Sequence, residues 1–111
     1  MNIARTVIDA LEDKKGEDIV LMDVHELADF ADYFVVCSGT SDRMLQALAD
    51  GVVEKVKKSY SVRARLEGKP QEGWLLIDLG DVIVHLFSPD RRSYYRLEEL
   101  WGRAKVLLRL Q

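Results

Sequence analysis

Features that would indicate secretion or a membrane are missing from this sequence. It contains one cysteine, Cys37, so no disulfide can form within the chain, and a reducing compartment fits. No stretch approaches the roughly 20 apolar residues that a membrane-spanning helix needs. The N-terminus has no apolar run of the signal-peptide kind, and its early acidic residues are not typical of a transit peptide. These absences predict a cytoplasmic protein without a membrane segment.

A basic excess is also missing. The chain has 16 Lys and Arg against 19 Asp and Glu, a net charge of −3, whereas proteins that grip phosphates usually carry a basic surface. Residues 1–50 hold 11 acidic and 4 basic residues (net −7), and residues 51–111 hold the other 8 and 12 (net +4). Either the protein has two faces of opposite sign, or its solvated helix faces simply differ in composition.

Repeats, low-complexity segments and linkers are absent too, and only two prolines interrupt the chain. The length of 111 residues suits one domain, and a hydrophobic content of 48% is enough for one core. We therefore expect a single domain over residues 1–111.

Helices and strands alternate along the chain. Apolar residues recur every three or four positions in the helical segments, whereas the strand segments are short, apolar and rich in branched residues. Gly16 ends the first helix, and Thr40 or Ser41 is the natural N-cap of the second. The predicted elements are a helix over 2–15, strands over 18–24 and 33–38, a helix over 42–58, strands over 62–66, 74–79 and 81–87, and a last helix from Pro89.

This order predicts an α/β fold with a mixed five-stranded sheet flanked by helices. The strands around Gly80 form an antiparallel hairpin, and the strand–helix–strand unit over 33–66 is a candidate for a parallel, right-handed crossover. Residues 67–73 read as a loop. An apolar stripe supports the last helix, with members Leu97, Leu100, Trp101, Ala104, Leu107 and Leu108.

Two motifs could serve nucleotide chemistry, and each has a structural explanation. Asp78 and Asp81 flank Gly80, but carboxylates that share metal ions usually alternate on one strand face, and aspartate is common in turns. The segment Gly39-Thr-Ser-Asp42 joins a strand to a helix and could hold a phosphate, yet it is not a P-loop and a plain N-cap explains it. We expect no metal and no cofactor.

Nucleophilic chemistry is equally weakly supported. His85 lies in mid-strand, where a lone histidine is usually structural, and Cys37 lies among apolar residues, where it acts as a small hydrophobe. A Cys37/His85 pair is conceivable without local support, and His25 is the only other histidine. The residues therefore fit a binding module better than an enzyme.

Aromatic and basic residues offer binding alternatives. Arg91 and Arg92 with Tyr94 and Tyr95 could stack on RNA or anchor a protein interface, or the tyrosines could pack at the last helix. Direct RNA binding would use Arg63, Arg65, Arg91 and Arg92. Trp74, at a strand end, is either a core residue or an interface anchor.

Several segments carry a family resemblance, at matching order and spacing over residues 18–101. The most specific is Trp74-Leu-Leu-Ile-Asp-Leu-Gly-Asp-Val-Ile-Val-His-Leu-Phe87. The others are Asp32-Tyr-Phe-Val-Val-Cys-Ser-Gly-Thr-Ser-Asp-Arg43, Glu67-Gly68, and Arg92-Ser-Tyr-Tyr-Arg-Leu-Glu-Glu-Leu-Trp101. The chain resembles the ribosomal silencing factor (RsfS, Iojap-like) family.

The resemblance implies a nucleotidyltransferase-like fold without the catalytic carboxylates and a function that is not enzymatic. It implies binding to the large ribosomal subunit through its ribosomal protein number fourteen at the intersubunit face, which blocks subunit joining and represses translation when nutrients are scarce. It also implies a homodimer. An acidic protein fits a basic protein partner better than rRNA, so no direct nucleic-acid site is expected.

The matching signature residues are the candidates for partner binding. We interpret Trp74 and Leu79 as apolar anchors, Asp81 as an acceptor for a partner cation, and Gly80 as a turn of close approach, while His85 supports the hairpin. These candidates, with one from the last motif, are Trp74, Leu79, Gly80, Asp81, His85 and Tyr95. Residues 102–111 extend beyond the family ending and either lengthen the last helix or aid self-association. The alternative function is a nucleotide-binding or nucleotidyltransferase-like enzyme using Asp78, Asp81 and the Gly39 turn.

Overall fold

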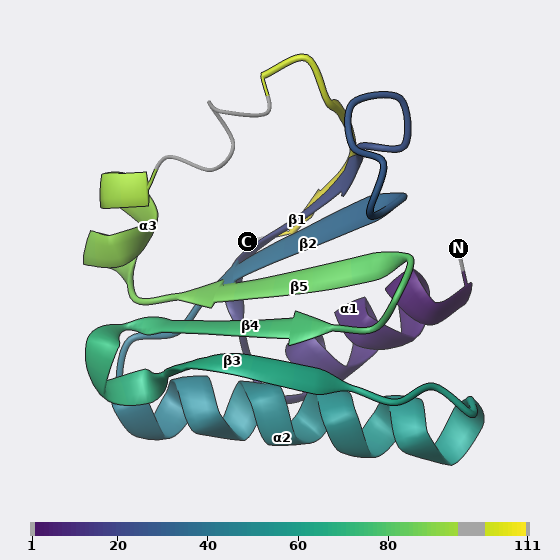
Figure 1. Ribbon diagram of the computed structural model, residues 1–111. Coiled ribbons are helices and arrows are strands. Elements are labelled where there is room, and N and C mark those ends of the chain that lie inside the picture. The colour runs from purple at the N-terminus through teal and green to yellow at the C-terminus, as the bar shows by residue number, and fades with distance from the viewer. Residues whose placement is uncertain (1, 96–101, 111) are drawn as a thin grey trace.

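The computed structural model describes residues 2–95 and 102–110, apart from the side chains of Tyr94 and Tyr95 (Figure 1). None of the described helices is long and apolar enough to cross a membrane. The elements are α1 (Asn2–Asp13), β1 (Glu17–Asp23), β2 (Tyr33–Ser38), α2 (Asp42–Ser59), β3 (Arg65–Lys69), a 3-10 turn (Pro70–Glu72), β4 (Trp74–Asp78), β5 (Val82–Phe87), α3 (Pro89–Tyr95) and β6 (Lys105–Leu110).

The strands form one mixed sheet in the order β3-β4-β5-β2-β1-β6. The pair β2–β5 is parallel and the other neighbouring pairs are antiparallel. The α/β class and the mixed sheet are confirmed, with six strands in place of the predicted five. Strands β2 and β3 run in the same direction, as the predicted crossover requires, but β4 and β5 lie between them.

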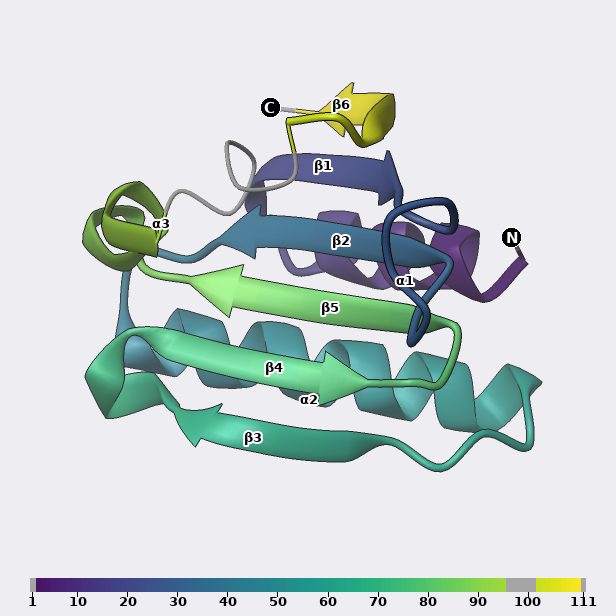
Figure 2. The same ribbon diagram turned by 45° about the horizontal axis from the view of Figure 1, so that its top comes forward.

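Helices α1 and α2 cover one face of the sheet, which we name the first face (Figure 2). Their apolar stripes put Val7 and Leu11 of α1, and Leu48 and Val52 of α2, at zero exposure in the main core. Helix α2 begins after Ser41, whose hydroxyl accepts the N–H of Met44 at 3.0 Å. The predicted N-cap is therefore confirmed, and the Gly39 segment is explained by the helix start.

The opposite face of the sheet, which we name the second face, carries a smaller core. The connection over residues 24–32 packs Val24, Ala28 and Ala31 against this core near one end of the sheet. Helix α3 lies on the same side near the other end (Figure 1). The strand residues buried here are Val20, Met22, Phe34, Val36, Ile83 and Phe87, with Trp74 and Leu76 packed at their margin.

The hairpin predicted around Gly80 is confirmed. Gly80 has φ +91°, and the Leu79 N–H donates to the Val82 carbonyl at 2.9 Å. The Asp78 carboxylate accepts the Gly80 N–H at 2.9 Å, a local bond that explains aspartate at this position. The Asp81 carbonyl accepts the N–H groups of Asp32 and Tyr33, which fixes the turn against the start of β2.

Two predicted boundaries are wrong. The last helix is contradicted over residues 105–110, which pair with β1 as the antiparallel edge strand β6. Helix α3 is described over Pro89–Tyr95, and the predicted stripe residues Leu97, Leu100 and Trp101 lie outside the described residues. Backbone pairing with a distant strand outweighs the helical leucine spacing there, and Gly102 is a poor helix residue. The third strand also lies later than predicted, at Arg65–Lys69, because it pairs with β4 across the short 3-10 turn rather than ending before a loop.

Candidate functional site

Trp74 lies at the start of β4 and Leu76 follows two residues later, both half-buried on the second face. Trp74 pairs with Phe87 and Leu76 pairs with His85 across the β4–β5 ladder. Exposed Phe30, with 61% of its surface accessible, lies on the 24–32 connection and contacts the Phe34 ring at 6.0 Å between centroids. The second face therefore presents partly accessible apolar side chains beside its small core.

The predicted residues fall into two groups. Gly80 and Asp81 are exposed at the turn after β4, and Trp74 is at the start of β4, so the groups are separated by roughly 15–20 Å of strand. Leu79 is only 2% exposed and belongs to the main core on the first face, so its interpretation as an accessible anchor does not fit. Tyr95 is the last described residue of α3, and its side chain lies outside the described part.

His85 is buried, with 8% exposure, on the second face. Its ring lies edge-on to Phe34 at 4.9 Å and stacks with Phe87 at 6.2 Å between centroids. Burial lowers the pKa of His85 to about 4, so the ring is neutral near pH 7. Its Nε2 has no hydrogen-bond partner among the described residues. His85 thus packs like an aromatic residue between Phe34 and Phe87, beside Leu76 on the neighbouring strand, in keeping with the predicted supporting role.

The buried His85 predicts an acid-sensitive fold. Because its pKa is lower in the folded chain than the ordinary 6.5, the unfolded chain binds the proton more tightly, and stability falls as the pH drops from 6.5 toward 4. The lowering is equivalent to roughly 3 kcal/mol. We expect His85→Phe to flatten the pH dependence of urea unfolding across this window, measured against the parent chain. An unchanged slope would contradict the account of His85.

The structure does not bring the candidate catalytic residues Cys37 and His85 together. Cys37 pairs with Leu86 and lies in the core of the first face, whereas His85 lies on the second face, so the sheet separates them. Burial also raises the pKa of the Cys37 thiol to about 12, which disfavours the reactive thiolate. Within residues 2–95 and 102–110, no group of three or more His, Cys, Asp or Glu side chains could hold a metal ion.

The arginines proposed for RNA are not gathered either. Arg63 and Arg65 are exposed near the edge strand β3, where Arg65 pairs with Asp78 at the Gly80 end, whereas exposed Arg91 belongs to α3 near the opposite end. Arg92 was expected at a binding surface, but it is 8% exposed. The four residues do not form one basic surface.

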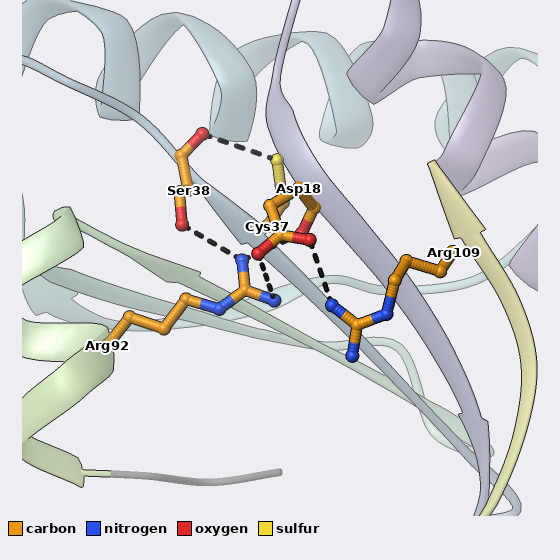
Figure 3. Close-up of polar contacts among 5 residues, drawn as sticks. All are labelled: Asp18, Cys37, Ser38, Arg92 and Arg109. Atoms are coloured by element: carbon orange, nitrogen blue, oxygen red, sulfur yellow. Dashed lines mark hydrogen bonds and ion pairs between the residues drawn. The ribbon is translucent and has the colours of Figure 1, made fainter. Parts of the chain in front are cut away.

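The buried Arg92 belongs to a polar cluster that the sequence reasoning missed (Figure 3). Its Nη1 donates to the Asp18 carbonyl at 2.7 Å and to Ser38 Oγ at 2.9 Å, and its Nη2 lies 3.6 Å from the Asp18 carboxylate. Arg109 of β6 donates to the same carboxylate at 3.1 Å. Asp18 therefore joins α3 and β6 to the start of β1. No local sequence signal marks this long-range contact.

The Gly39 turn follows Ser38, which pairs with Phe87, whereas Asp81 is bonded to Tyr33 at the other end of β2, so these two parts of the proposed nucleotide site lie apart. The fold and site define a small α/β protein with partly accessible apolar side chains, Trp74 and Leu76, on one sheet face. The family model "Ribosomal silencing factor during starvation" matches residues 1–110. The chain therefore belongs to the ribosomal silencing factor (RsfS) family.

Individual relatives agree with this assignment. The chain is 41% identical to the ribosomal silencing factor RsfS of Bacillus subtilis over 95% of this chain and 89% of the relative. It is 35% identical to the mouse mitochondrial assembly of ribosomal large subunit protein 1 over 86% of this chain and 43% of that protein. A crystal structure of a protein from Chromobacterium violaceum superposes with TM-score 0.86 at 40% identity, covering 91% of this chain and 84% of the other. These names indicate translation regulation and association with ribosomes.

Proposed function

We propose that this protein binds the large ribosomal subunit and sterically blocks joining of the small subunit, as a binding protein rather than an enzyme. The observation that carries the proposal is the half-buried pair Trp74 and Leu76 on the second face. Large side chains that are partly accessible at a rigid strand are suited to become buried by a partner, and tryptophan is enriched among residues that dominate binding energy. This role would have the protein act in the cytoplasm.

We further propose ribosomal protein number fourteen of the large subunit as the direct partner. A ribosomal protein of basic surface would complement this chain, whose net charge is −3. Exposed Asp81 at the Gly80 turn, with exposed Asp32 bonded to it through the backbone, offers carboxylates to partner cations. The partly accessible side chains of Trp74 and Leu76 would supply affinity, and the two carboxylates would set the orientation of the complex and its association rate.

Calorimetric titration with the purified ribosomal protein tests this partner. We expect saturable binding of one partner per chain that weakens with Asp81→Asn and persists when rRNA is absent. Binding to intact large subunits without binding to the isolated protein would contradict the choice of partner. A parallel titration with magnesium and nucleoside triphosphates is expected to give no heat, and saturable heat there would support the enzyme alternative.

We also propose that the chain forms a homodimer through the free edge of β6. This edge strand carries three of the large exposed apolar side chains, Val106, Leu107 and Leu108, at 51%, 39% and 39% exposure. The opposite edge strand, β3, instead presents Arg65, Glu67 and Lys69, and charged residues are a common protection of sheet edges. Antiparallel pairing with β6 of a second copy would cover the apolar edge and satisfy its outward backbone groups.

The dimer proposal predicts that Leu108→Lys yields a monomer. A lysine at the centre of the edge strand opposes pairing with another strand by charge, while its site at 39% exposure leaves the folded chain room for the longer side chain. Sedimentation equilibrium of the parent chain and the variant measures the mass. Leu66→Lys, at an exposed leucine of β3, is the matched control and should keep the parent mass. A dimer that survives Leu108→Lys would rule out this edge.

A further inference from the structure

The described part of helix α3, Pro89–Tyr95, contacts the sheet through a buried arginine. Of its described side chains, Arg92 is the buried one, whereas Pro89, Asp90, Arg91 and Ser93 are exposed. Among the described side chains of this helix, a guanidinium therefore takes the place that an apolar residue usually has.

The acceptor side of this contact is locally strained. Asp18 has φ +48°, in the left-handed region that a residue with a Cβ rarely adopts, and the β1–β2 register shifts between Glu17 and Val20 at the same place. This irregularity accompanies the placement of both the carbonyl and the carboxylate of Asp18 on the Arg92 guanidinium (Figure 3). Such backbone strain persists where the surrounding structure holds it, and it concentrates at functional sites.

The other end of α3 is fixed to the residue that precedes Trp74. The Ser88 N–H donates to the Gly73 carbonyl at 2.9 Å. A Cβ at Gly73 would come within 2.5 Å of Ser88 Oγ and 2.8 Å of Arg91 Cγ, so the helix start packs directly on this glycine. Trp74 in turn pairs with Phe87, the last residue of β5. A shift of α3 would therefore disturb the surroundings of Trp74.

We propose that Arg92 is a positioning residue for partner binding: it fixes α3 against Asp18 and Ser38 and thereby sets the environment of Trp74. The inference rests on the proposed binding function. A buried ion pair adds little net stability compared with apolar packing, but a planar guanidinium with directed donors defines an orientation. The arrangement thus favours a geometric role over a purely stabilising one.

The test compares Arg92→Lys and Arg92→Met with Arg63→Met, a control at an exposed arginine near β3 and away from α3. We expect the Arg92 variants to remain folded and to bind large subunits at least about tenfold more weakly, while Arg63→Met binds within about threefold of the parent chain. Arg92→Lys keeps the positive charge but loses the planar guanidinium and its directed donors, so this variant remains informative if Arg92→Met does not fold. Parent-like binding by Arg92→Lys or Arg92→Met, once its folded fraction is accounted for, would overturn the proposal.

A second readout does not depend on ribosomes. In a Trp101→Phe background, Trp74 is the remaining tryptophan, and we expect Arg92→Met to shift its fluorescence emission to longer wavelength and to speed hydrogen exchange at the Arg92 and Ser93 amides. Amides of β2 and β5 should keep their protection. Unchanged emission and exchange would overturn the positioning role. If the parent chain fails to bind large subunits, the proposed function fails, while this readout still decides whether Arg92 positions Trp74.

Discussion

Trp74→Ala is expected to weaken binding to large ribosomal subunits by at least about thirtyfold, equivalent to roughly 2 kcal/mol, which is the scale of a dominant interface residue. The side chain is half-buried at the margin of the second face rather than enclosed in the core. Its removal should therefore reduce the apolar surface available to a partner while leaving the main core of the first face intact. Cosedimentation over a range of subunit concentrations measures the affinity.

The matched control for this variant is Leu66→Ala. Leu66 is 48% exposed on the neighbouring strand β3, and its pairing with Ile77 places it on the first face. The Leu66→Ala substitution removes an apolar side chain from the other face of the sheet, so we expect its affinity for large subunits to equal that of the parent chain. Equal losses for both variants, or none for Trp74→Ala in a folded chain, would show that the second face is not the binding surface.

Gly68→Ala is expected to lower the free energy of unfolding by about 2–4 kcal/mol and to weaken large-subunit binding as well. Gly68 has φ +91°, so a Cβ introduces backbone strain. That Cβ would also lie 2.5 Å from Cε3 of the Trp74 ring and 2.6 Å from the Trp74 carbonyl. The carbonyl belongs to the β3–β4 ladder and cannot move alone, so the tryptophan must be displaced. Urea unfolding and cosedimentation measure the two effects.

Gly80→Ala separates strain from steric displacement. Gly80 has the same φ of +91°, but a Cβ there would meet no atom within 4 Å. The Gly80→Ala variant should therefore lower the free energy of unfolding only by the cost of placing alanine in the left-handed region, about 1–2 kcal/mol. If Gly68→Ala destabilised the chain no more than Gly80→Ala, the contact between Gly68 and Trp74 would not have the importance that we assign to it.

Local patterns were sufficient to predict much of the fold. The apolar spacing of α1 and α2, the Ser41 cap and the Gly80 hairpin depend on residues close together in the sequence, and each is confirmed. The alternation of side chains along β4 also contained the information that places Leu79 in the core rather than at a binding surface. Leu75, Ile77 and Leu79 alternate with Trp74, and all three lie in the core of the first face. The family signature suggested Leu79 as an anchor, but the alternation was the better guide.

Long-range contacts were beyond local reasoning. The segment 105–110 has leucines at helical spacing, and it becomes a strand because β1, more than 80 residues earlier, supplies a partner. Arg92 reads as a surface cation, yet its acceptors Asp18 and Ser38 are 74 and 54 residues away. The left-handed conformation of Asp18 has no marker such as glycine. These features depend on tertiary structure, which single-residue propensities do not encode.

Sedimentation of purified large and small subunits, with and without the protein, tests the central claim most directly. The account predicts that the protein travels with the large subunits and that the peak of joined ribosomes falls as its concentration rises, with Trp74→Ala much less effective. A protein that stays at the top of the gradient while the subunits join normally would contradict it.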